Sequence, residues 1–429
     1  MIILSSTVDF VLGRRIHDST SLSQRKLFLY ISLAVNLGLL GVFKYFNFFV
    51  GSLIDSFSLI GIQLDPISLN IILPVGISFY TFQTLSYTID IYRNRLKPTD
   101  NSLHFFAFVS FFPQLVAGPI ERARDLLPQF EIKRSFDLES TKKGLRQILW
   151  GLFKKVVIAD GCAVYVNLIF DAPDSYSSIL LILGAVLFSI QIYCDFSGYS
   201  DIAIGLAKLL GFKLTKNFDF PFFSTSITEM WRRWHITLST WTGEYIFLPL
   251  THKWKKMGRR GITLALIATF LILGIWHGAN WTFVAFGLFH GAIVASEYLL
   301  RRSLRRKDQI LKNTYLISIT GWMTTMALWL VGMILFRAES IDKAFSYLTH
   351  IFTQPIWDGA LPFIMGCKVV LFFALVMLVF EWINRKEDFG LAIGKWKGTW
   401  ILRWSVYYTL IFAMLRYAGH QQDFIYFQF

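Results

Sequence analysis

Two histidines are the residues of this chain best suited to acid-base chemistry. His277 lies in Trp-His-Gly-Ala-Asn-Trp at positions 276–281, and His235 ends Trp-Arg-Arg-Trp-His at positions 231–235. Imidazole is the side chain whose unperturbed pKa lies near neutrality, so it can take a proton from a weak nucleophile such as an alcohol. We therefore treat His277 as a candidate general base and His235 as its candidate partner.

The sequence around His277 predicts that this imidazole is held inside a membrane. Residues 261–276 are uncharged and follow a basic cluster at 253–260, whereas residues 281–300 carry one formal charge and precede a basic cluster at 301–307. Short basic loops stay in the cytoplasm, so the chain is expected to enter the membrane and return. The first run would rise about 24 Å as a helix, less than the roughly 30 Å of bilayer hydrocarbon. An ionisable group at that depth is a functional candidate by default.

Composition indicates a multi-pass membrane protein. Apolar residues make up 54% of the chain, the mean hydropathy is +0.50, and charged residues make up only 16%, against roughly 25% in an ordinary soluble domain. The net charge of +14 could indicate nucleic-acid binding, but Lys and Arg lie in short clusters between apolar runs. That pattern is typical of cytoplasmic loops, so the expected surroundings are a lipid bilayer and no nucleic-acid partner is expected. The three cysteines form no CxxC pair, so no metal site is indicated.

The apolar runs predict an all-α fold of transmembrane helices. Pro74 interrupts one run, two lysines at 154–155 lie early in another, and residues 105–116 are too few to cross upright. Irregular backbone is tolerated where it lines a cavity, so we expect a ring of tilted helices around a central chamber, with re-entrant and interfacial helices. No repeat is evident, and we expect residues 1–429 to form one membrane domain. The expected spans are 28–50, 67–89, 145–170, 179–193, 261–276, 281–300, 315–336, 361–382 and 400–415.

The segment around His235 is expected to be a continuous helix. Trp231, His235 and Leu238 would then share one face. Glu229 and Arg233 would be able to pair at a spacing of i, i+4. This arrangement would point His235 inward with the aromatic side chains, so that two histidines approach one chamber from different segments.

Structural roles are the alternative for each of these residues. Either histidine could hydrogen-bond a backbone carbonyl in a packed bundle. His290 lies 13 positions after His277, about 220° around a continuous helix, and no HExxH pair is present, so a zinc site is poorly supported and His290 is interpreted as structural. Asp195 and Asp201 stand beside an apolar run and could orient the chamber or bind a cation, but helix-end capping explains them equally well.

Several longer motifs share a pattern with one known family. They are Phe-Lys-Tyr-Phe-Asn-Phe at 43–48, Pro-Val-Gly-Ile-Ser-Phe-Tyr at 74–80, Phe-Pro-Gln-Leu-Val-Ala-Gly-Pro-Ile at 112–120, and the segments 195–205, 230–239, 276–280 and 424–427. With these motifs the chain resembles the membrane-bound O-acyltransferases, and among them the bacterial alginate O-acetyltransferases. The resemblance also implies additional hydrophobic sequence before Met1, so the apolar start of the chain is interpreted as the end of a missing or shortened span.

The resemblance assigns roles to particular residues. The histidine of the family's Trp-His-Gly motif, which carries the catalytic role, falls on His277. A second polar residue some forty positions earlier, histidine in this branch, falls on His235. The neighbouring residues expected to bind substrates are Trp276, Asn280, Trp231, Trp234 and Asp195.

The resemblance further implies an acetyltransferase of the bacterial inner membrane. The expected donor is a cytoplasmic thioester, acetyl-CoA, and no bound cofactor is expected. The expected acceptors are hydroxyl groups of an exported polysaccharide such as alginate, reached directly or through a periplasmic acetyltransferase or relay protein. Two other functions are compatible with a protein that has many membrane spans and buried ionisable groups. They are D-alanyl transfer to teichoic acid and non-enzymatic transport of a polysaccharide.

Overall fold

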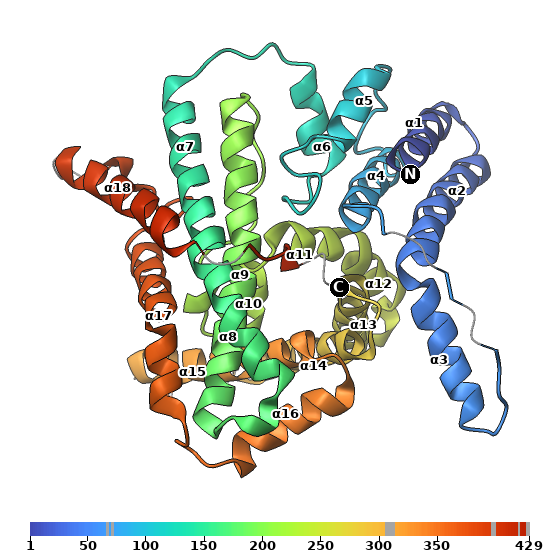
Figure 1. Ribbon diagram of the computed structural model, residues 1–429. Helices are drawn as coiled ribbons and strands as arrows, with labels where there is room; N and C mark the ends of the chain where they lie inside the picture. Colours follow the sequence, from blue (N-terminus) through green and yellow to red (C-terminus); the bar gives the residue numbers. More distant parts are fainter. Residues whose placement is uncertain (66–67, 70–72, 305–313, 396–399, 419–420, 426–429) are drawn as a thin grey trace. The chain divides into compact units, whose positions relative to one another are not determined.

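The prediction of an all-α fold is confirmed. The computed structural model describes residues 1–65, 68–69, 73–304, 314–395, 400–418 and 421–425, and it contains no strand within them (Figure 1). Parts of three expected features lie outside the described residues: residues 67 and 70–72 of the expected span at 67–89, residues 305–307 of the second basic cluster and residues 426–427 of the C-terminal motif. The chain divides into two compact units, of which the first comprises Met1–Leu138 and Ala207–Thr215 and the second Glu139–Leu206 and Lys216–Phe429. The expectation of one domain and of a ring around a chamber stays a prediction.

The first unit is built on three helices that pack against one another: α1, α2 and α4. Its helices are α1 (Ile2–Asp18), α2 (Leu22–Leu40), which continues through a π-helical turn into α3 (Phe46–Ser58), α4 (Ile77–Tyr92), α5 (Ser102–Val109) and α6 (Ala123–Leu126). Buried polar side chains join the three packed helices. Asp9 of α1 accepts hydrogen bonds from Ser32 at 2.6 Å and from Asn36 at 2.8 Å, both in α2, and the Thr84 hydroxyl of α4 donates to Asn36 Oδ1 at 3.1 Å. These hydrogen bonds satisfy polar groups for which the hydrocarbon of a bilayer offers no hydrogen-bond partner.

The expected span at 67–89 starts too early. The described helix α4 begins at Ile77, after Gly76 in the left-handed conformation with φ of 74°. A Cβ atom at Gly76 would lie 2.3 Å from the carbonyl oxygen of Leu115. Pro74 and Gly76 therefore set the start of this helix, because neither a proline ring nor a left-handed residue continues a helix.

The second unit contains the remaining helices, including the long α9. They are α7 (Leu138–Phe153), α8 (Asp160–Asp171), α9 (Ser178–Leu209), α10 (Ile227–Arg233), α11 (Ile236–Thr242), α12 (Leu248–Lys253), α13 (Arg259–His277), α14 (Trp281–Leu304), α15 (Thr314–Arg337), α16 (Ile341–Thr353), α17 (Ala360–Ile383) and α18 (Trp400–Tyr417). A π-helical segment, Lys154–Ala159, joins α7 to α8 at the two lysines that made this run irregular in sequence.

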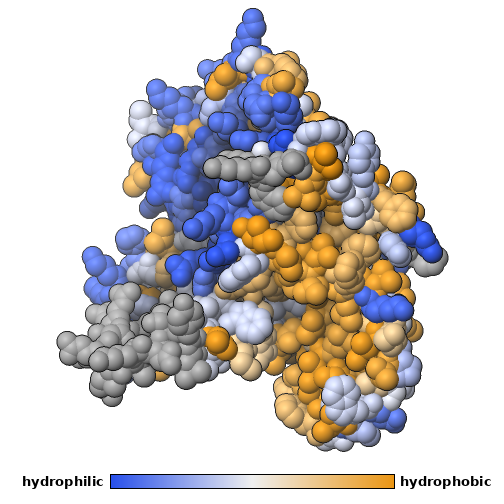
Figure 2. Space-filling model, turned by 90° about the vertical axis from the view of Figure 1, so that its left-hand side faces the viewer, coloured by the Kyte–Doolittle hydropathy of each residue, from blue (hydrophilic) through white to orange (hydrophobic). Residues whose placement is uncertain are grey.

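In the part of the chain that the structure describes, six helical segments are long and apolar enough to cross a membrane: Leu22–Ser58, Ser178–Leu209, Arg259–His277, Trp281–Leu300, Ser318–Arg337 and Ala360–Ile383. Four of the predicted runs match the last four of these closely. Helix α17 also shows the expected exposure, since Leu361, Leu375 and Phe372 are each at least 59% exposed. Figure 2 shows a broad apolar area on one face of the structure and hydrophilic side chains gathered above it.

The interpretation of Asp195 and Asp201 as helix-end caps is wrong. Helix α9 does not end near Tyr193 but continues to Leu209, so both aspartates lie well inside it. Each carboxylate meets a lysine instead: Asp195 Oδ1 lies 2.9 Å from Lys155 Nζ, and Asp201 Oδ2 lies 2.6 Å from Lys154 Nζ. Pairing with a cation is what allows a carboxylate to be placed inside an apolar helix bundle.

Helices α13 and α14 form a close hairpin that presents His277 at its turn (Figure 1). A Cβ atom at Gly274 would lie 2.3 Å from the carbonyl oxygen of Phe283 and 2.9 Å from Cα of Gly287. The two backbones therefore approach as closely as small residues permit, a common way to pack helices in membranes.

This packing predicts that Gly274→Ala destabilises the protein by about 1–3 kcal/mol, because the added methyl group would force the hairpin apart. The measurement is thermal unfolding of the purified variant in detergent. Gly38→Ala is the matched control, since a Cβ atom at this position of α2 meets nothing within 4 Å. Equal melting temperatures for the two variants would contradict the close approach.

Candidate active site

His277 is the last residue of α13, at the end opposite the basic start of that helix. Its side chain is 3% exposed. Aromatic rings surround it, with centroids at 5.0 Å for Trp276, 5.2 Å for Phe336 and 5.8 Å for Phe286. The imidazole predicted to lie deep in the protein is therefore buried among apolar rings contributed by three helices.

His235 does not lie in a continuous helix, so the predicted face of Trp231, His235 and Leu238 is wrong. Helix α10 ends at Arg233, and α11 begins at Ile236. Between them His235 adopts the left-handed conformation, with φ of 43° and ψ of 55°. A conformation of this kind is unfavourable for a residue with a side chain and persists only where the surroundings hold it.

Two backbone hydrogen bonds hold the segment around His235. The N–H group of Asp219 donates to the carbonyl oxygen of Arg233 at 2.9 Å, and the N–H group of Ile236 donates to that of Asn217 at 2.8 Å. The predicted pair of Glu229 and Arg233 is confirmed, with 2.9 Å between Oε1 and Nη2. The chain at 217–219 thus runs alongside the break and supports it.

The side chain of Asn217 determines the protonation of the His235 ring. Asn217 Oδ1 accepts hydrogen bonds from the N–H group of Thr237 at 3.3 Å and from its hydroxyl at 2.8 Å, so this atom is an acceptor. Its contact of 3.0 Å with His235 Nδ1 is then a bond donated by the ring. Burial lowers the pKa of His235 to about 3, so the ring is neutral near pH 7 and its lone pair lies on Nε2.

The structure brings the two histidines to one aromatic side chain. The ring of Trp276 lies 6.1 Å from that of His235 and 5.0 Å from that of His277, measured between centroids. Phe196 of α9 also packs against the His235 ring, with 4.6 Å between the ring centroids. Two histidines that are 42 positions apart in sequence therefore pack against the same indole.

The predicted tryptophans extend this aromatic cluster. Trp231 packs against Phe286 at 6.1 Å, and Trp234 packs against Trp329 at 4.8 Å. His290, interpreted from sequence as structural, lies within the same cluster at 5.4 Å from Trp231. These side chains form the wall around the two imidazoles.

Asn280 and Asp195 lie in contacts within the protein. Asn280 Nδ2 donates to the carbonyl oxygen of Glu339 at 2.8 Å, while its Oδ1 accepts from the N–H group of Thr282 at 3.0 Å at the start of α14. Asp195 Oδ2 accepts a hydrogen bond of 2.7 Å from the N–H group of Ile425, and its other oxygen meets Lys155. Their predicted role in substrate binding stays a prediction.

Glu297 is a structural support of the site that sequence reasoning missed. This residue of α14 accepts hydrogen bonds from the N–H groups of Ile227 at 2.8 Å and Thr228 at 3.0 Å, and from the Thr228 hydroxyl at 2.6 Å. A carboxylate at a helix N-terminus satisfies amide groups that have no partner within the helix. Glu297 thereby ties α10, which leads to His235, to the helix that follows His277. The sequence feature that could have identified Glu297 is that it carries the only formal charge in residues 281–300.

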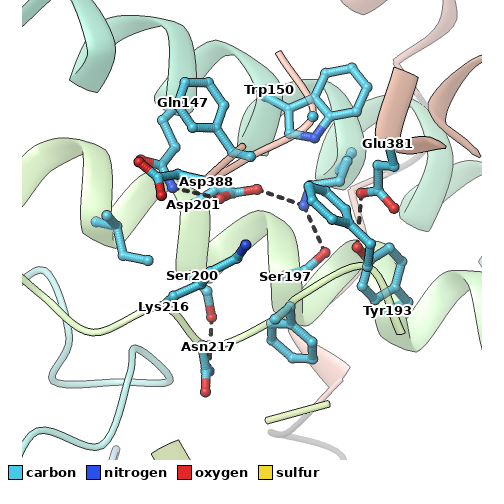
Figure 3. Close-up of a pocket in the computed structure, with 16 residues that line it drawn as sticks. Gln147, Trp150, Tyr193, Ser197, Ser200, Asp201, Lys216, Asn217, Glu381 and Asp388 are labelled. Carbon is cyan, nitrogen blue, oxygen red and sulfur yellow. Dashed lines mark hydrogen bonds and ion pairs between the residues drawn. The ribbon is translucent and has the colours of Figure 1, made fainter. Parts of the chain in front are cut away.

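A polar cavity lies beside the His235 segment, between α7, α9 and α17 (Figure 3). Lys154 Nζ lies 2.6 Å from Asp201 Oδ2 and donates to the Ser197 hydroxyl at 2.8 Å. Opposite them, the Tyr193 hydroxyl donates to Glu381 Oε1 at 2.8 Å. Lys216 and Asp388 also line the cavity, so its described wall contains three carboxylates and two ammonium groups of the second unit.

This cavity is small but still polar. Its volume of about 20 Å³ is enough for one water molecule. Trp150 Nε1 and Glu381 Oε2 belong to its wall and have no hydrogen-bond partner among the residues that the structure describes. Asn217 also lines the cavity, where its Nδ2 lies 3.1 Å from the Ser200 hydroxyl. Asn217 thus connects the cavity to His235. Within the described part of the chain, no three His, Cys, Asp or Glu side chains are grouped to hold a metal ion.

Comparison with known proteins matches residues 92–341 to the MBOAT, membrane-bound O-acyltransferase family. A probable alginate O-acetylase of Azotobacter vinelandii is 41% identical over 331 residues, which are 76% of this chain and 63% of the relative. A peptidoglycan O-acetyltransferase of Helicobacter pylori is 33% identical over 374 residues, 81% of this chain and 69% of the relative. A teichoic acid D-alanyltransferase of Bacillus subtilis is 29% identical over 238 residues, 52% of this chain and 59% of the relative. The chain thus spans less than two thirds of the length of the alginate relatives.

The contacts of Glu297 predict that Glu297→Ala destabilises the protein by roughly 2–4 kcal/mol, because two amide groups of α10 lose a charged acceptor. Thermal unfolding in detergent measures the change. The control is Glu339→Ala, which removes an exposed carboxylate paired with Lys343 and should change stability by less than about 0.5 kcal/mol. If both variants unfold at the wild-type temperature, Glu297 does not hold α10.

Proposed function

The chain belongs to the membrane-bound O-acyltransferase family, and from this premise we propose that it transfers an acetyl group from a thioester donor to hydroxyl groups of an exported polysaccharide. The family match covers residues 92–341, which include both histidines. The observation that carries the proposal is that His235 and His277 both pack against one indole, Trp276, in a buried aromatic cluster.

His277 is proposed as the general base. The acceptor oxygen attacks the thioester carbonyl while His277 takes the proton of the hydroxyl group. The C–S bond then breaks, and the imidazolium returns the proton to the leaving thiolate, so no net proton is released. The apolar rings around His277 keep water from competing for the thioester.

His235 is proposed to position a reactant and not to polarise the thioester carbonyl. Polarisation would require a donor on Nε2, whereas the hydrogen bond to Asn217 commits the ring proton to Nδ1. With its lone pair on Nε2, a neutral His235 can accept a hydrogen bond from a second hydroxyl group of the acceptor and so orient it, while the proton of the attacking hydroxyl group goes to His277. Orientation of this kind contributes to rate because the reacting atoms need a defined approach.

We propose acetyl-CoA as the donor and the bacterial inner membrane as the location. The basic residues before α13 would face the cytoplasm by the positive-inside rule and would attract the phosphates of CoA. The acceptor is proposed to be alginate or a similar polysaccharide, because the alginate O-acetylases are 38–41% identical to this chain. A periplasmic acetyltransferase or relay protein would complete transfer outside the membrane.

D-alanyl transfer to teichoic acid is the second candidate, since teichoic acid D-alanyltransferases are related to this chain at 28–29% identity. Supplying membranes with acetyl-CoA or with a D-alanyl carrier protein separates the two reactions.

Polysaccharide transport without catalysis is the third candidate function. A carrier would give no acylated product when purified protein is mixed with acetyl-CoA and acceptor.

The proposed base predicts that His277→Ala lowers acetyl transfer by at least about 100-fold, because the hydroxyl group loses its proton acceptor. The measurement is transfer of labelled acetyl groups from acetyl-CoA to polysaccharide in isolated membranes. His17→Ala, at an exposed position of α1, is the control and should keep wild-type activity. Full transfer by His277→Ala at normal protein level would rule out this assignment.

The bond between Asn217 and His235 predicts a change in pH dependence. Asn217→Ala should lower the transfer rate about tenfold or more, because the His235 ring loses its orientation. In Asn217→Asp the carboxylate still accepts the Nδ1 hydrogen, but its charge favours the imidazolium and raises the pKa of His235. The rate of this variant should therefore fall as the pH is lowered from 8 towards 5, because protonation removes the Nε2 lone pair. The comparison is with wild type, in which the pKa of about 3 keeps His235 neutral over that range. If the transfer rates of Asn217→Asp and wild type depend on pH in the same way, Asn217 has only a structural role.

A further inference from the structure

An apolar groove runs between α9, α15 and α17 in the second unit. Its volume is about 670 Å³, within the usual range of roughly 300–1,000 Å³ for ligand sites. The helices that border it are all long and apolar enough to cross a membrane. The side chains of the groove that matter for its chemistry are Ser189, Thr225, Trp322, Trp329, Leu378 and Trp382.

The polar groups of the groove are used within the protein. Ser189 Oγ accepts a hydrogen bond of 2.8 Å from Trp329 Nε1. The N–H group and hydroxyl of Thr225 donate to Glu229 Oε2 at 2.9 Å and 3.1 Å. The groove therefore offers its occupant an apolar surface, which suits a hydrocarbon chain.

Two tryptophans stand at the groove with their rings half exposed. Trp322 donates from Nε1 to the carbonyl oxygen of Phe222 at 2.8 Å, and the ring of Trp382 packs edge-on against Phe223 at 5.0 Å. Tryptophan is enriched where a membrane protein meets the headgroup region. Both residues therefore indicate a depth near the lipid headgroups.

A cation lies at the same place. The guanidinium of Arg385 lies 4.3 Å from the centroid of the Trp382 ring, and its Nη1 donates to the carbonyl oxygen of Trp382 at 2.7 Å. These contacts hold a positive charge beside the groove while leaving other guanidinium hydrogens to bind a phosphate.

We propose that this groove binds one acyl chain of an anionic phospholipid, with the lipid phosphate beside Arg385. The chain would lie against Trp329, which also packs against Trp234 at 4.8 Å, His290 at 5.7 Å and Trp231 at 6.0 Å. The bound lipid thus packs directly behind the aromatic cluster that holds the two histidines of the site. The site is independent of the acyl donor and acceptor, because neither histidine lines the groove.

Native mass spectrometry of the purified full chain tests the headgroup contact. After delipidation in detergent, phosphatidylglycerol or phosphatidylcholine is titrated back, and the bound lipid is counted. Wild type should retain one phosphatidylglycerol more tightly than phosphatidylcholine. Arg385→Gln should weaken phosphatidylglycerol binding about fivefold, the effect expected of one basic residue near a membrane surface. Lys386→Gln removes the adjacent exposed charge and should leave binding unchanged.

A second pair of variants tests the acyl-chain contact. Leu378→Trp fills the groove and should abolish the tight phosphatidylglycerol site, whereas Val379→Trp places the same ring at the next, exposed position of α17 and should preserve it. Melting temperatures establish that both variants are folded. Equal binding of the two lipids by wild type, or undiminished binding by both Arg385→Gln and Leu378→Trp, would overturn the proposal whatever reaction the protein catalyses.

Discussion

The hydrogen bond between the His235 ring and the carboxamide oxygen of Asn217 is the interaction on which the orientation of His235 depends. It accepts hydrogens from the His235 ring and from both donors of Thr237. The left-handed backbone of His235 costs of order 1–3 kcal/mol, so the surroundings must hold it in place. The contact that orients the ring also decides which of its nitrogens carries the proton. The same hydrogen bond therefore fixes both the orientation of the His235 ring and the nitrogen that carries its proton, so a substitution of Asn217 alters both.

The position of His277 is set by helix packing. His277 ends α13, and the glycine contacts of the α13 and α14 hairpin set the distance between the two helices. Glu297 then joins α14 to the start of α10 through hydrogen bonds to its first amide groups. Because α10 leads directly to His235, this carboxylate connects the two halves of the site. A charge inside an apolar helix is costly, and here it secures the relative position of two catalytic candidates.

The aromatic cluster joins the site to the membrane. Trp276 packs against both imidazoles, Trp231 and Trp234 extend the cluster, and Trp329 also lines the groove. Large rings exclude water while presenting few hydrogen-bonding groups. The same packing suits a thioester that must be protected from hydrolysis and a lipid chain that needs an apolar surface. Trp329 is thus shared by the aromatic cluster and the groove.

Hydropathy alone determined the class of fold and the extent of several helices. The runs at 315–336 and 361–382 match α15 (Thr314–Arg337) and α17 (Ala360–Ile383), because apolar length is a local property of the chain. The motif around His277 likewise identified a buried imidazole. The break at His235 could not be predicted, because it depends on hydrogen bonds to Asn217, 18 positions earlier, which override the local preference for a helix. The positions of Asp195 and Asp201 inside α9 depend in the same way on lysines of another segment. Residue types and spacing thus named the two histidines, whereas only the tertiary structure decided how one of them is turned and protonated, since those properties belong to contacts between distant parts of the chain.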